Sequence, residues 1–462
     1  LNAGSPDGQT ADGSANEYAL RSFFGRLTYD YDNRYLVEAN IRRDGTSRIF
    51  KDSRWGVFPS FSGAWRIINE PFMEGTRNVL SDLKLRGGWG VLGNQAISYY
   101  SYQSVLDQAN YSFGGTVVQG VAPVDGANRD LIWETTETLN FGLDMGFLGN
   151  QYTLSIEGYR KLTYDILMKL PVSTLYGLNA PYQNAGKVKN TGLEITAGYK
   201  LNTHGWNFQV SANAAYNKNE VMDLKNGGAR IWSGKYFNQE GYAINSIGGY
   251  IAEGLFKTEE EVANSATIPG TDTAPGDIKY RDINNDGKID GEDRVYIGNT
   301  MPKWTFGLNL FAEWKGLDAT FLFQGAADVQ GYLAGPGVVG EMIGAKGKPS
   351  YMYRDCWDAE TNPNGKFPRA FSSYRQNNSI YNPSSFWIVN SSYLRLKNFQ
   401  LGYTLPKEWC NMMGISRIRV YYSGQNLLTF TKFDKGFDPE SPEGGSSYPQ
   451  VKTNTFGLNI TF

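Results

Sequence analysis

Residues 455–462 alternate strictly between apolar positions and polar or small ones. The apolar members are Phe456, Leu458, Ile460 and Phe462, and the residues between them are Gly457, Asn459 and Thr461. Successive side chains of a β-strand point to opposite faces, so this pattern predicts a strand with one wholly apolar face. No later residue of the sequence is left to cover that face. We therefore expect it to lie against lipid or against the core of a neighbouring element.

The same alternation returns along the chain. Residues 23–31 and 35–41 alternate on either side of Asp32-Asn33, which predicts a hairpin. The most regular run, 304–314, has aromatic residues at both ends of its apolar stripe, as strands at the two interfaces of a membrane do. Between Leu396 and Phe399 the alternation slips by one residue, which predicts a β-bulge.

In the run 304–314 the alternation assigns side chains to two faces. Trp304, Phe306, Leu308 and Leu310 are expected to face lipid, and Thr305, Gly307 and Asn309 are expected to face the interior of a barrel.

Counting these runs gives about thirteen strands of about ten or more residues, longer than the ~5–6 residues usual in soluble sheets. Tilted strands that cross a bilayer need about 9–11 residues. Short connections are expected at Asp32-Asn33, Gly149-Asn150, Asn202-Thr203-His204 and Lys315-Gly316, with modest ones at 69–82 and 406–414 on the same side. The opposite side carries a brief connection at 49–54 and long ones at 94–130, 169–185, 219–302, 329–386 and 431–448. The predicted fold is all-β, a transmembrane antiparallel β-barrel.

The order of short and long connections also places the ends of the sequence. If Phe462 ends in the periplasm, every short turn is periplasmic and every long loop is extracellular. Residues before Glu17 then lie outside the cell. If the whole barrel has an even number of strands and a periplasmic N-terminus, an odd number of strands must precede them. We expect residues 1–462 to be the C-terminal portion of a larger barrel with long extracellular loops.

Charge and composition narrow the function. The 462 residues contain 44 Lys and Arg against 46 Asp and Glu, for a net charge of -2, so there is no basic field to attract nucleic acid. No run approaches the ~18 consecutive apolar residues of a membrane-spanning helix. A chain of this sequence that crosses a bilayer must therefore do so with strands.

Several segments carry a family resemblance. They are Asn16-Glu17-Tyr18, 24–29, 39–48, Trp55-Gly56-Val57-Phe58-Pro59-Ser60, 282–293, Gly298-Asn299, Pro302-Lys303, Leu394-Arg395-Leu396-Lys397-Asn398 and Gly424-Gln425-Asn426-Leu427. In this order they resemble the SusC/RagA class of TonB-dependent outer-membrane transporters. The resemblance implies a plug inside a barrel of about 22 strands, of which about nine would precede this chain. Neither the plug nor a motif for contacting the TonB complex is visible in this sequence.

The family resemblance also implies a function. Members import large nutrients across the outer membrane, chiefly oligosaccharides and in some cases oligopeptides, with a SusD-like surface lipoprotein as partner and energy from TonB. We expect this chain to belong to such an importer, with oligosaccharide favoured over oligopeptide as cargo. Two alternatives remain: a secreted β-rich carbohydrate-binding protein or hydrolase, which would dissolve without detergent, and a passive porin, which would need no energy source.

The C-terminal strand carries a further resemblance. Thr455, Gly457, Ile460 and Phe462 match the positions of the signal that directs the assembly of outer-membrane barrels.

The sharpest chemical motif is residues 282–293. Asp282, Asn284 and Asp286 stand at positions 1, 3 and 5, Gly287 follows for a sharp turn, and Asp293 stands at position 12. This spacing is that of an EF-hand-like calcium loop, in which the carbonyl of Lys288 would be a further ligand. Asp293 is shorter than the usual Glu, as in dockerin-type loops. The alternative is a cluster of turn-forming residues in a surface loop; if bound, the ion would hold the loop together.

Catalysis has little support in the sequence. His204 is the only histidine, and it stands in a predicted turn. Glu157, Glu194 and Glu313 could pair as glycosidase carboxylates, but all three fall on polar strand faces and are expected to line the lumen. Cys356 and Cys410 fall in connections on opposite sides of the membrane, so we expect no disulfide between them. We expect no enzyme.

The long loops are rich in aromatic residues, among them Trp232, Tyr236, Phe237, Tyr250, Tyr351, Trp357 and Tyr381. Such rings can stack on sugars, pack loop against loop, or contact a partner protein.

Overall fold

The structure is a computed structural model that describes residues 13, 15–333, 351–370, 382–433, 437–441 and 450–462. Its main feature is one antiparallel sheet of 13 strands, each hydrogen-bonded to its neighbours in the order β1-β2-β3-β4-β7-β8-β11-β12-β19-β20-β23-β24-β25. The strands are β1 (Leu20–Tyr31), β2 (Tyr35–Thr46), β3 (Trp55–Arg66), β4 (Leu80–Asn94), β7 (Glu134–Phe147), β8 (Tyr152–Tyr164), β11 (Lys187–Thr203), β12 (Trp206–Asp223), β19 (Trp304–Trp314), β20 (Leu317–Ala327), β23 (Tyr393–Thr404), β24 (Arg417–Thr431) and β25 (Thr453–Thr461). The predicted all-β class and strand count are confirmed.

The connections contain short elements of their own. The small strands are β5 (Leu106–Phe113), β6 (Thr116–Pro123), β9 (Leu167–Lys169), β10 (Tyr182–Asn184), β13 (Ile231–Ser233), β14 (Tyr236–Asn238), β15 (Ser246–Gly249), β16 (Ala252–Leu255), β17 (Ile278–Tyr280), β18 (Val295–Gly298), β21 (Gln330–Tyr332) and β22 (Ile388–Asn390). The helical turns are η1 (Ile67–Asn69), η2 (Pro71–Thr76), η3 (Thr174–Tyr176), α1 (Glu259–Ala263), η4 (Gly291–Asp293), α3 (Tyr351–Arg354), η5 (Ser385–Trp387) and α4 (Lys407–Met412). In the part of the chain that the structure describes, no helix is long and apolar enough to cross a membrane.

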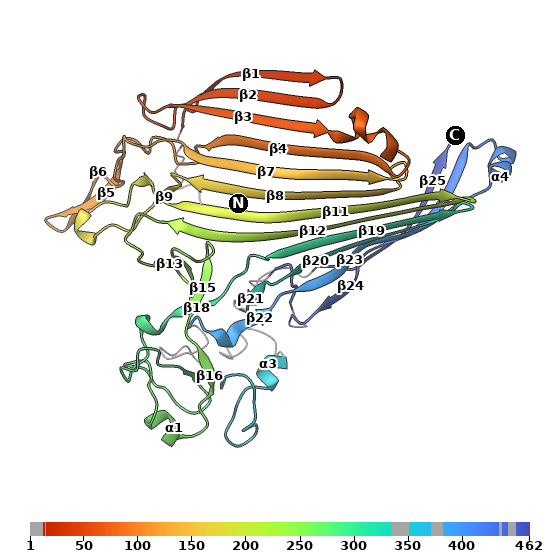
Figure 1. The fold of residues 1–462 in the computed structure, drawn as a ribbon. Coiled ribbons are helices and arrows are strands. Elements are labelled where there is room, and N and C mark those ends of the chain that lie inside the picture. Colours follow the sequence, from red (N-terminus) through yellow and green to blue (C-terminus); the bar gives the residue numbers. More distant parts are fainter. Residues whose placement is uncertain (1–12, 14, 334–350, 371–381, 434–436, 442–449) are drawn as a thin grey trace, which may run out of the picture.

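Short and long connections gather at opposite ends of the sheet, as predicted. Figure 1 shows the tight turns and α4 at one end of the strands, with the long loops at the other end. The turns after β11 and β19 are two residues each, His204-Gly205 and Lys315-Gly316, and all four residues have positive φ. This conformation matches the twist of the flanking strands. The predicted turn at Asn202-Thr203-His204 was placed too early, because Asn202 and Thr203 still pair with β12.

Strand register agrees with the predicted two faces. Leu308 in β19 lies opposite Ala212 in β12 and Phe323 in β20, while the adjacent Asn309 lies opposite Ser211 on the other face. A slip of one residue would exchange the faces of a whole strand, so the apolar stripe holds the register. Aromatic pairs mark both ends of β19: Trp314 stacks on Trp206 at 5.2 Å between ring centroids, and Trp304 packs against Tyr216 at 5.0 Å.

A β-bulge lies where the sequence predicted it. In β23, Leu396 pairs with Phe323 of β20 and Asn398 pairs with Leu322, so Lys397 has no residue opposite it in β20. On the other side of β23 the register with β24 shifts at the same place. The extra residue explains why the apolar stripe changes phase between Leu396 and Phe399.

The two ends of the strand order are β1 and β25, so over the described residues the sheet is open. In β25, Phe456 is 82% exposed on the apolar face, and Gly457 lies on the other face beneath the ring of Tyr421. A Cβ atom at position 457 would stand 2.2 Å from the Tyr421 Cζ atom. Gly457 is therefore required by close packing, whereas the role of Thr455, Gly457, Ile460 and Phe462 as an assembly signal stays a prediction.

The assignment of faces can be tested in the full-length protein. Leu308→Arg should lower the free energy of unfolding in liposomes by about 2–4 kcal/mol if the site lies at mid-bilayer, because it places a charge in hydrocarbon. Asn309→Arg, one residue along and on the opposite face, is the matched control and should cost much less. Single cysteines at positions 304–310, probed with a lipid-soluble quencher, give an independent measurement. Equal accessibility at odd and even positions would overturn the register.

The fit of Tyr421 over Gly457 gives a second test. Gly457→Val should destabilise the barrel by about 1–3 kcal/mol, because the tyrosine ring must leave its position. Gly25→Ala is the control, since a Cβ atom there meets only Ile41 Cγ2 at 3.9 Å. Adding Tyr421→Ala to Gly457→Val should recover most of the loss in thermal stability. If it recovers none, the steric explanation is wrong.

Candidate functional site

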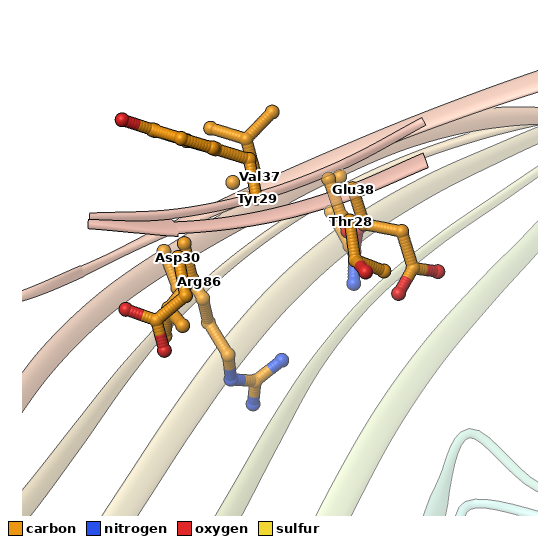
Figure 2. Close-up of a pocket in the computed structure, with 13 residues that line it drawn as sticks. Thr28, Tyr29, Asp30, Val37, Glu38 and Arg86 are labelled. Atoms are coloured by element: carbon orange, nitrogen blue, oxygen red, sulfur yellow. The ribbon is translucent and has the colours of Figure 1, made fainter. Parts of the chain in front are cut away.

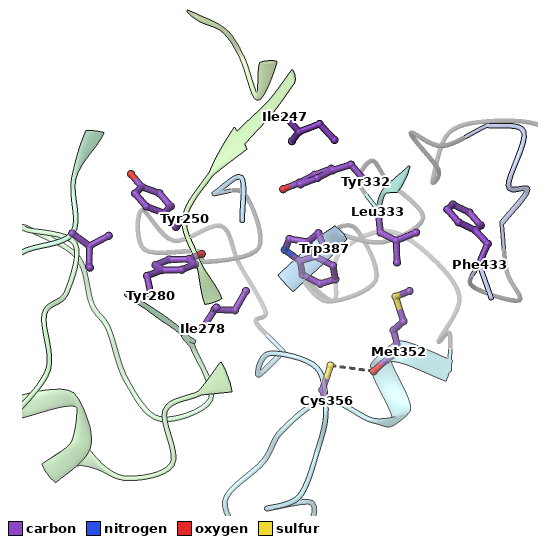
Figure 3. Close-up of a cluster of buried hydrophobic side chains, with 11 residues drawn as sticks. Ile247, Tyr250, Ile278, Tyr280, Tyr332, Leu333, Met352, Cys356, Trp387 and Phe433 are labelled. Atoms are coloured by element: carbon purple, nitrogen blue, oxygen red, sulfur yellow. Dashed lines mark hydrogen bonds between the residues drawn. The ribbon is translucent and has the colours of Figure 1, made fainter. Parts of the chain in front are cut away.

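Three of the long connections at one end of the sheet fold together into a single body, the loop body, and we call its hydrophobic core the loop core. Its buried residues are Ile247, Tyr250, Ile278, Tyr280, Ile289, Tyr332, Leu333, Met352, Cys356, Trp387 and Phe433. They come from three different connections, between β12 and β19, β20 and β23, and β24 and β25. Figure 3 shows Trp387 between Tyr332, Leu333 and the rings on the β15–β17 side. Burying each large side chain contributes about 1.5–3 kcal/mol, so the three loops stabilise one another.

Ion pairs join these loops to one another and to the sheet. Asp277, which is 1% exposed, pairs with Arg369 through Oδ1 at 2.9 Å and Oδ2 at 3.0 Å. Arg395 in β23, 2% exposed, pairs with both oxygens of Asp438 at 2.9 and 3.0 Å. The Arg369 pair is bidentate, through its Nε and Nη2 atoms, and such a pair fixes orientation as well as contact. The two pairs connect residues that are 92 and 43 positions apart, so no local sequence pattern predicts them.

Most of the loop aromatics pack loop against loop. Phe237, Tyr250 and Trp357 are buried at 0, 9 and 8% exposure, and Tyr236 packs against the loop core. Trp232 keeps 36% of its surface exposed, with the Arg294 guanidinium 3.9 Å from its ring centroid. Tyr351 begins α3, and Tyr381 lies outside the described residues. Among the rings of this set whose side chains the structure describes, Trp232 is therefore the most exposed.

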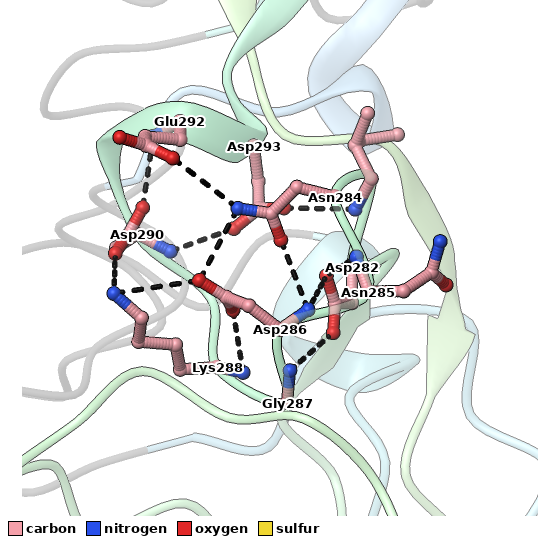
Figure 4. A network of polar contacts seen from close by, with 10 residues as sticks. Asp282, Asn284, Asn285, Asp286, Gly287, Lys288, Asp290, Glu292 and Asp293 are labelled. Carbon is pink, nitrogen blue, oxygen red and sulfur yellow. Dashed lines mark hydrogen bonds and ion pairs between the residues drawn. The ribbon is translucent and has the colours of Figure 1, made fainter.

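The predicted calcium loop forms one compact turn (Figure 4). The carboxylate of Asp282 accepts from the backbone N–H groups of Asn285 at 2.6 Å and Gly287 at 2.8 Å, and Gly287 has the positive φ of 84° expected for its sharp turn. Asp293 is fully buried, and its two oxygens accept from the N–H groups of Ile283 and Asp290. The turn also packs into the loop core through Ile289, at position 8 of the motif.

The side chains around the centre of this turn are linked to one another. The Lys288 ammonium lies 2.6 Å from Asp290 Oδ2 and 3.4 Å from Asp286 Oδ2, and it lowers the pKa of the Asp290 carboxyl. The Asn284 amide nitrogen donates to Asp286 and Glu292. Within the described residues, no group of three or more His, Cys, Asp or Glu side chains is placed to hold a metal ion. The structure brings Asp282, Asn284 and Asp286 together, and places Asp293 against the backbone beside them.

The polar face of the sheet carries charged networks. Arg86 in β4 bonds Asp144 at 3.1 Å and also contacts Glu157, and Arg419 in β24 forms a bidentate pair with Asp318. Figure 2 shows a hollow on this face where Thr28, Asp30, Glu38 and Arg86 lie on one side of the strands and Tyr29 and Val37 on the other. The hollow has a volume of 570 Å³. This face suits water and polar solutes, not lipid.

The residues considered for catalysis lie in the sheet or in one of its turns. Glu157 and Glu194 lie directly opposite each other on adjacent strands, and Glu157 is bonded by Arg86 and Asn140. Glu313 pairs across strands with Asp318. His204 lies in a tight turn with its Nδ1 atom 2.8 Å from Thr203 Oγ1. These positions agree with the predicted lining and turn roles.

Both cysteines are free, as predicted, and both are buried. Cys356 lies in the loop core region with its Sγ atom 3.5 Å from the carbonyl oxygen of Met352. Burial raises the pKa of the Cys356 thiol to about 11, so the reactive thiolate is scarce at neutral pH. Cys410 lies on α4, at the other end of the sheet.

Comparison with known proteins agrees with this architecture. Residues 1–427 match the family model described as "TonB dependent receptor-like, beta-barrel". The chain is 32% identical over 491 residues to TonB-dependent receptor SusC of Bacteroides thetaiotaomicron, covering 98% of this chain and 44% of SusC. It is 31% identical over 471 residues to TonB-dependent receptor P3 of Formosa agariphila, covering 97% of this chain and 46% of the relative. The chain thus spans less than half the length of these relatives.

Solved structures give the same result at the level of fold. The structure of the RagAB peptide transporter superposes with a TM-score of 0.79 at 27% identity, covering 96% of this chain and 47% of that one. The RagAB peptide importer in its "open-open" state gives a TM-score of 0.78 over 99% of this chain. Sequence matches over nearly the whole chain and a shared strand architecture lead to one conclusion. This chain belongs to the TonB-dependent receptor β-barrel family of outer-membrane proteins, and within it to the SusC/RagA group.

Proposed function

We propose that this chain is the C-terminal portion of a TonB-dependent transporter that imports an oligosaccharide across the outer membrane. The observation that carries the proposal is the pairing of a polar-lined sheet with a folded loop body at one end of it. A polar interior lets a hydrated solute pass, and a loop body held by its own core offers a fixed surface at the entrance. Family membership supports transport over the secreted-protein and passive-porin alternatives.

The rest of the importer would come from parts outside this chain. A plug and a TonB-contacting region would supply gating and energy, and a SusD-like surface lipoprotein would bind over the loop body. The broad polar and aromatic surface of the loops, with Trp232 exposed, suits such a partner.

An oligopeptide cargo is the second candidate. It is favoured by the likeness to RagAB, which is a peptide transporter. The identity to SusC, 32%, and to RagAB, 27%, does not separate the two cargo classes. The preference for oligosaccharide rests on the family resemblance as a whole.

We further propose that residues 282–293 bind a structural calcium ion. The donors that the turn brings together are carboxylate and amide oxygens, the type that calcium prefers at about 2.3–2.6 Å. An ion at the centre would take the place of the Lys288 ammonium beside Asp286, and the Asn284 amide would present its oxygen instead of its nitrogen. The carbonyl of Lys288 and the carboxylate of Asp293 would complete the ligand set. Such an ion would stabilise the loop body and take no part in transport chemistry.

Transport is tested by deleting the gene for the full-length protein from the cell that makes it. Growth on at least one oligosaccharide as the carbon source should be lost, and the wild-type protein should restore it. A variant without the TonB-contacting region is the control, and it should reach the membrane without restoring growth. Mild detergent extraction should recover a surface lipoprotein with the barrel. Loss of growth on peptides alone would favour the oligopeptide cargo, and unchanged growth on every oligosaccharide and peptide, with a barrel that purifies alone, would contradict import.

Calcium is tested by proteolysis of the loop body. In the wild type, a chelator should speed cleavage within residues 224–303, because the acidic turn loses its central ion. Asp282→Ala should be cleaved quickly with or without chelator, whereas Glu260→Ala, in the same loop but outside the turn, should behave as the wild type does. Identical cleavage of the wild type with and without chelator would show that the segment is an ordinary hydrogen-bonded turn.

A further inference from the structure

Two arginines lie on the apolar face of the sheet, toward its long-loop end. Arg21 in β1 and Arg43 in β2 share the face of Tyr29, which Figure 2 shows on the opposite side of the strands from the charged residues of the hollow. Arg43 lies opposite Phe23 and Arg21 lies opposite Gly45, so the two arginines are diagonal neighbours on one face. The Cα atoms of diagonal neighbours are about 7–8 Å apart, which lets both guanidinium groups reach one small ligand.

Two aromatic rings hold these arginines in place. Trp55 of β3 lies across Gly45, where an added Cβ atom would stand 2.8 Å from the tryptophan ring, and it stacks on Phe23 at 6.1 Å between ring centroids. The Arg43 guanidinium lies 4.9 Å from the Trp55 ring centroid. The Arg21 guanidinium lies 5.0 Å from the Phe23 ring centroid. Cation–π contacts of this kind orient a guanidinium without using its N–H donors. We call Arg21, Phe23, Arg43 and Trp55 the arginine platform.

The guanidinium N–H donors of the platform have no acceptor in the part of the chain that the structure describes. Neither arginine side chain forms an ion pair or a hydrogen bond there, and both are exposed. The residues opposite Arg43 on its two neighbouring strands, Phe23 and Val57, carry no charge. The carboxylate next in sequence, that of Asp44, faces the other way and accepts from Arg42 Nε at 2.6 Å. Over the described residues, the platform therefore presents two positive charges whose donors are available to a ligand.

The place of Arg43 along β2 puts it near the edge of the apolar band of the barrel. It stands eight residues beyond Tyr35, which stacks on Trp65 at the short-turn end of the same face. Eight residues span about 27 Å of strand. At a strand tilt of about 35–45° this is about 20 Å of membrane depth, against an apolar band about 25 Å tall with aromatic girdles at both interfaces. Arg43 and Trp55 therefore lie at a girdle, where lipid headgroups begin and a charge costs far less than at mid-bilayer.

The two ends of the apolar face differ in charge. Arg160 of β8 lies on the face of Ile156, toward the same end as the arginine platform, and it too is exposed. At the short-turn end, the last residues of β1 to β3 on this face are the rings of Tyr31, Tyr35 and Trp65. In the orientation expected from the connections, the arginines meet the outer leaflet and these rings meet the inner leaflet.

A phosphate group on a membrane lipid suits the arginine platform. The platform faces the membrane, so a lipid is the molecule that meets it. Arginine binds phosphate through paired N–H groups, and basic clusters beside membranes bind the phosphorylated headgroups of lipids. Phe23, which is 52% exposed, and Trp55, which is 37% exposed, offer apolar surface to the first carbons of the acyl chains.

We propose that the arginine platform binds the phosphate of an outer-leaflet lipid. One phosphate group would accept from the guanidiniums of Arg21 and Arg43, and the acyl chains would continue along the apolar face beside Phe23. The site lies on the outside of the barrel wall, so the proposal does not depend on which cargo passes through the interior. A lipid held here would stay with the protein when the surrounding lipids are exchanged for detergent.

The test is native mass spectrometry of the full-length transporter in mild detergent micelles that contain monophosphoryl lipid A, a lipid with one phosphate group. The wild type should retain at least one molecule of lipid A. Arg21→Gln combined with Arg43→Gln should weaken the affinity about tenfold or more, as expected for lost bonds between charged groups. Thermal stability without lipid should not fall. Arg26→Gln, on the opposite face of β1, is the matched control and should retain lipid A as the wild type does.

Two further variants separate a built site from a general attraction between charges. Arg160→Gln removes a cation from the same face and end but leaves the platform whole, so its affinity for lipid A should stay at the wild-type level. An equal loss in this variant and in the double variant would overturn the site. Trp55→Leu keeps both charges and removes the larger ring, and affinity should fall about threefold or more, the strength of one cation–π contact. Unchanged affinity would contradict the role of the rings.

Other probes identify the source of the phosphate. Phosphatidylcholine, whose phosphate is neutralised by its own ammonium group, and inorganic phosphate should both bind much more weakly than lipid A. Retention of phosphatidylcholine equal to that of lipid A would mean an unselective lipid coat. Inorganic phosphate that displaces lipid A at equal concentration would mean a site for a dissolved anion. Either result overturns the proposal, as does a wild-type protein that retains no lipid A, and growth of the deletion strain still decides import.

Discussion

A strand within a bilayer has no water to satisfy its backbone, so each N–H and C=O group within the hydrocarbon must find a partner on a neighbouring strand. In this chain that constraint produces long, continuous pairings, such as the 17 register pairs between β11 and β12. Continuous pairing leaves the side chains to alternate strictly between lipid and interior. The apolar stripe of β19 and the charged network around Arg86 are therefore two results of one rule.

Outside the bilayer the constraint ends, and the chain uses a different means of holding itself together. The loop body has only short strands, and its stability comes from the loop core and from buried ion pairs such as Asp277 with Arg369. This division places a loop body with its own core at one end of a continuously hydrogen-bonded sheet. The acidic turn at 282–293 belongs to the loop body because Ile289 anchors it in the same core.

Alternation along the sequence was sufficient to predict the strands, the ends at which short and long connections lie, and the bulge at Lys397, because each of these is a local property of the chain. The turn after β11 was misplaced because Asn202 and Thr203 are polar yet still pair with β12. The loop core could not be predicted, since its contacts join residues from separate connections. The sequence does not distinguish aromatic side chains that form a core from those that stay exposed. Only burial separates Phe237 from Trp232.

The composition of the loop core bears on how the protein folds. Phe433 lies beyond β24, close to the end of the chain, yet it packs in the same cluster as Ile247, almost two hundred positions earlier. Contacts of such long sequence separation form late and slow folding, because the intervening chain must first be ordered. The loop core is therefore complete only after the connection between β24 and β25 has joined it. A chain arrested before that step would expose the aromatic surface of an incomplete core, which is the kind of surface that chaperones and proteases recognise.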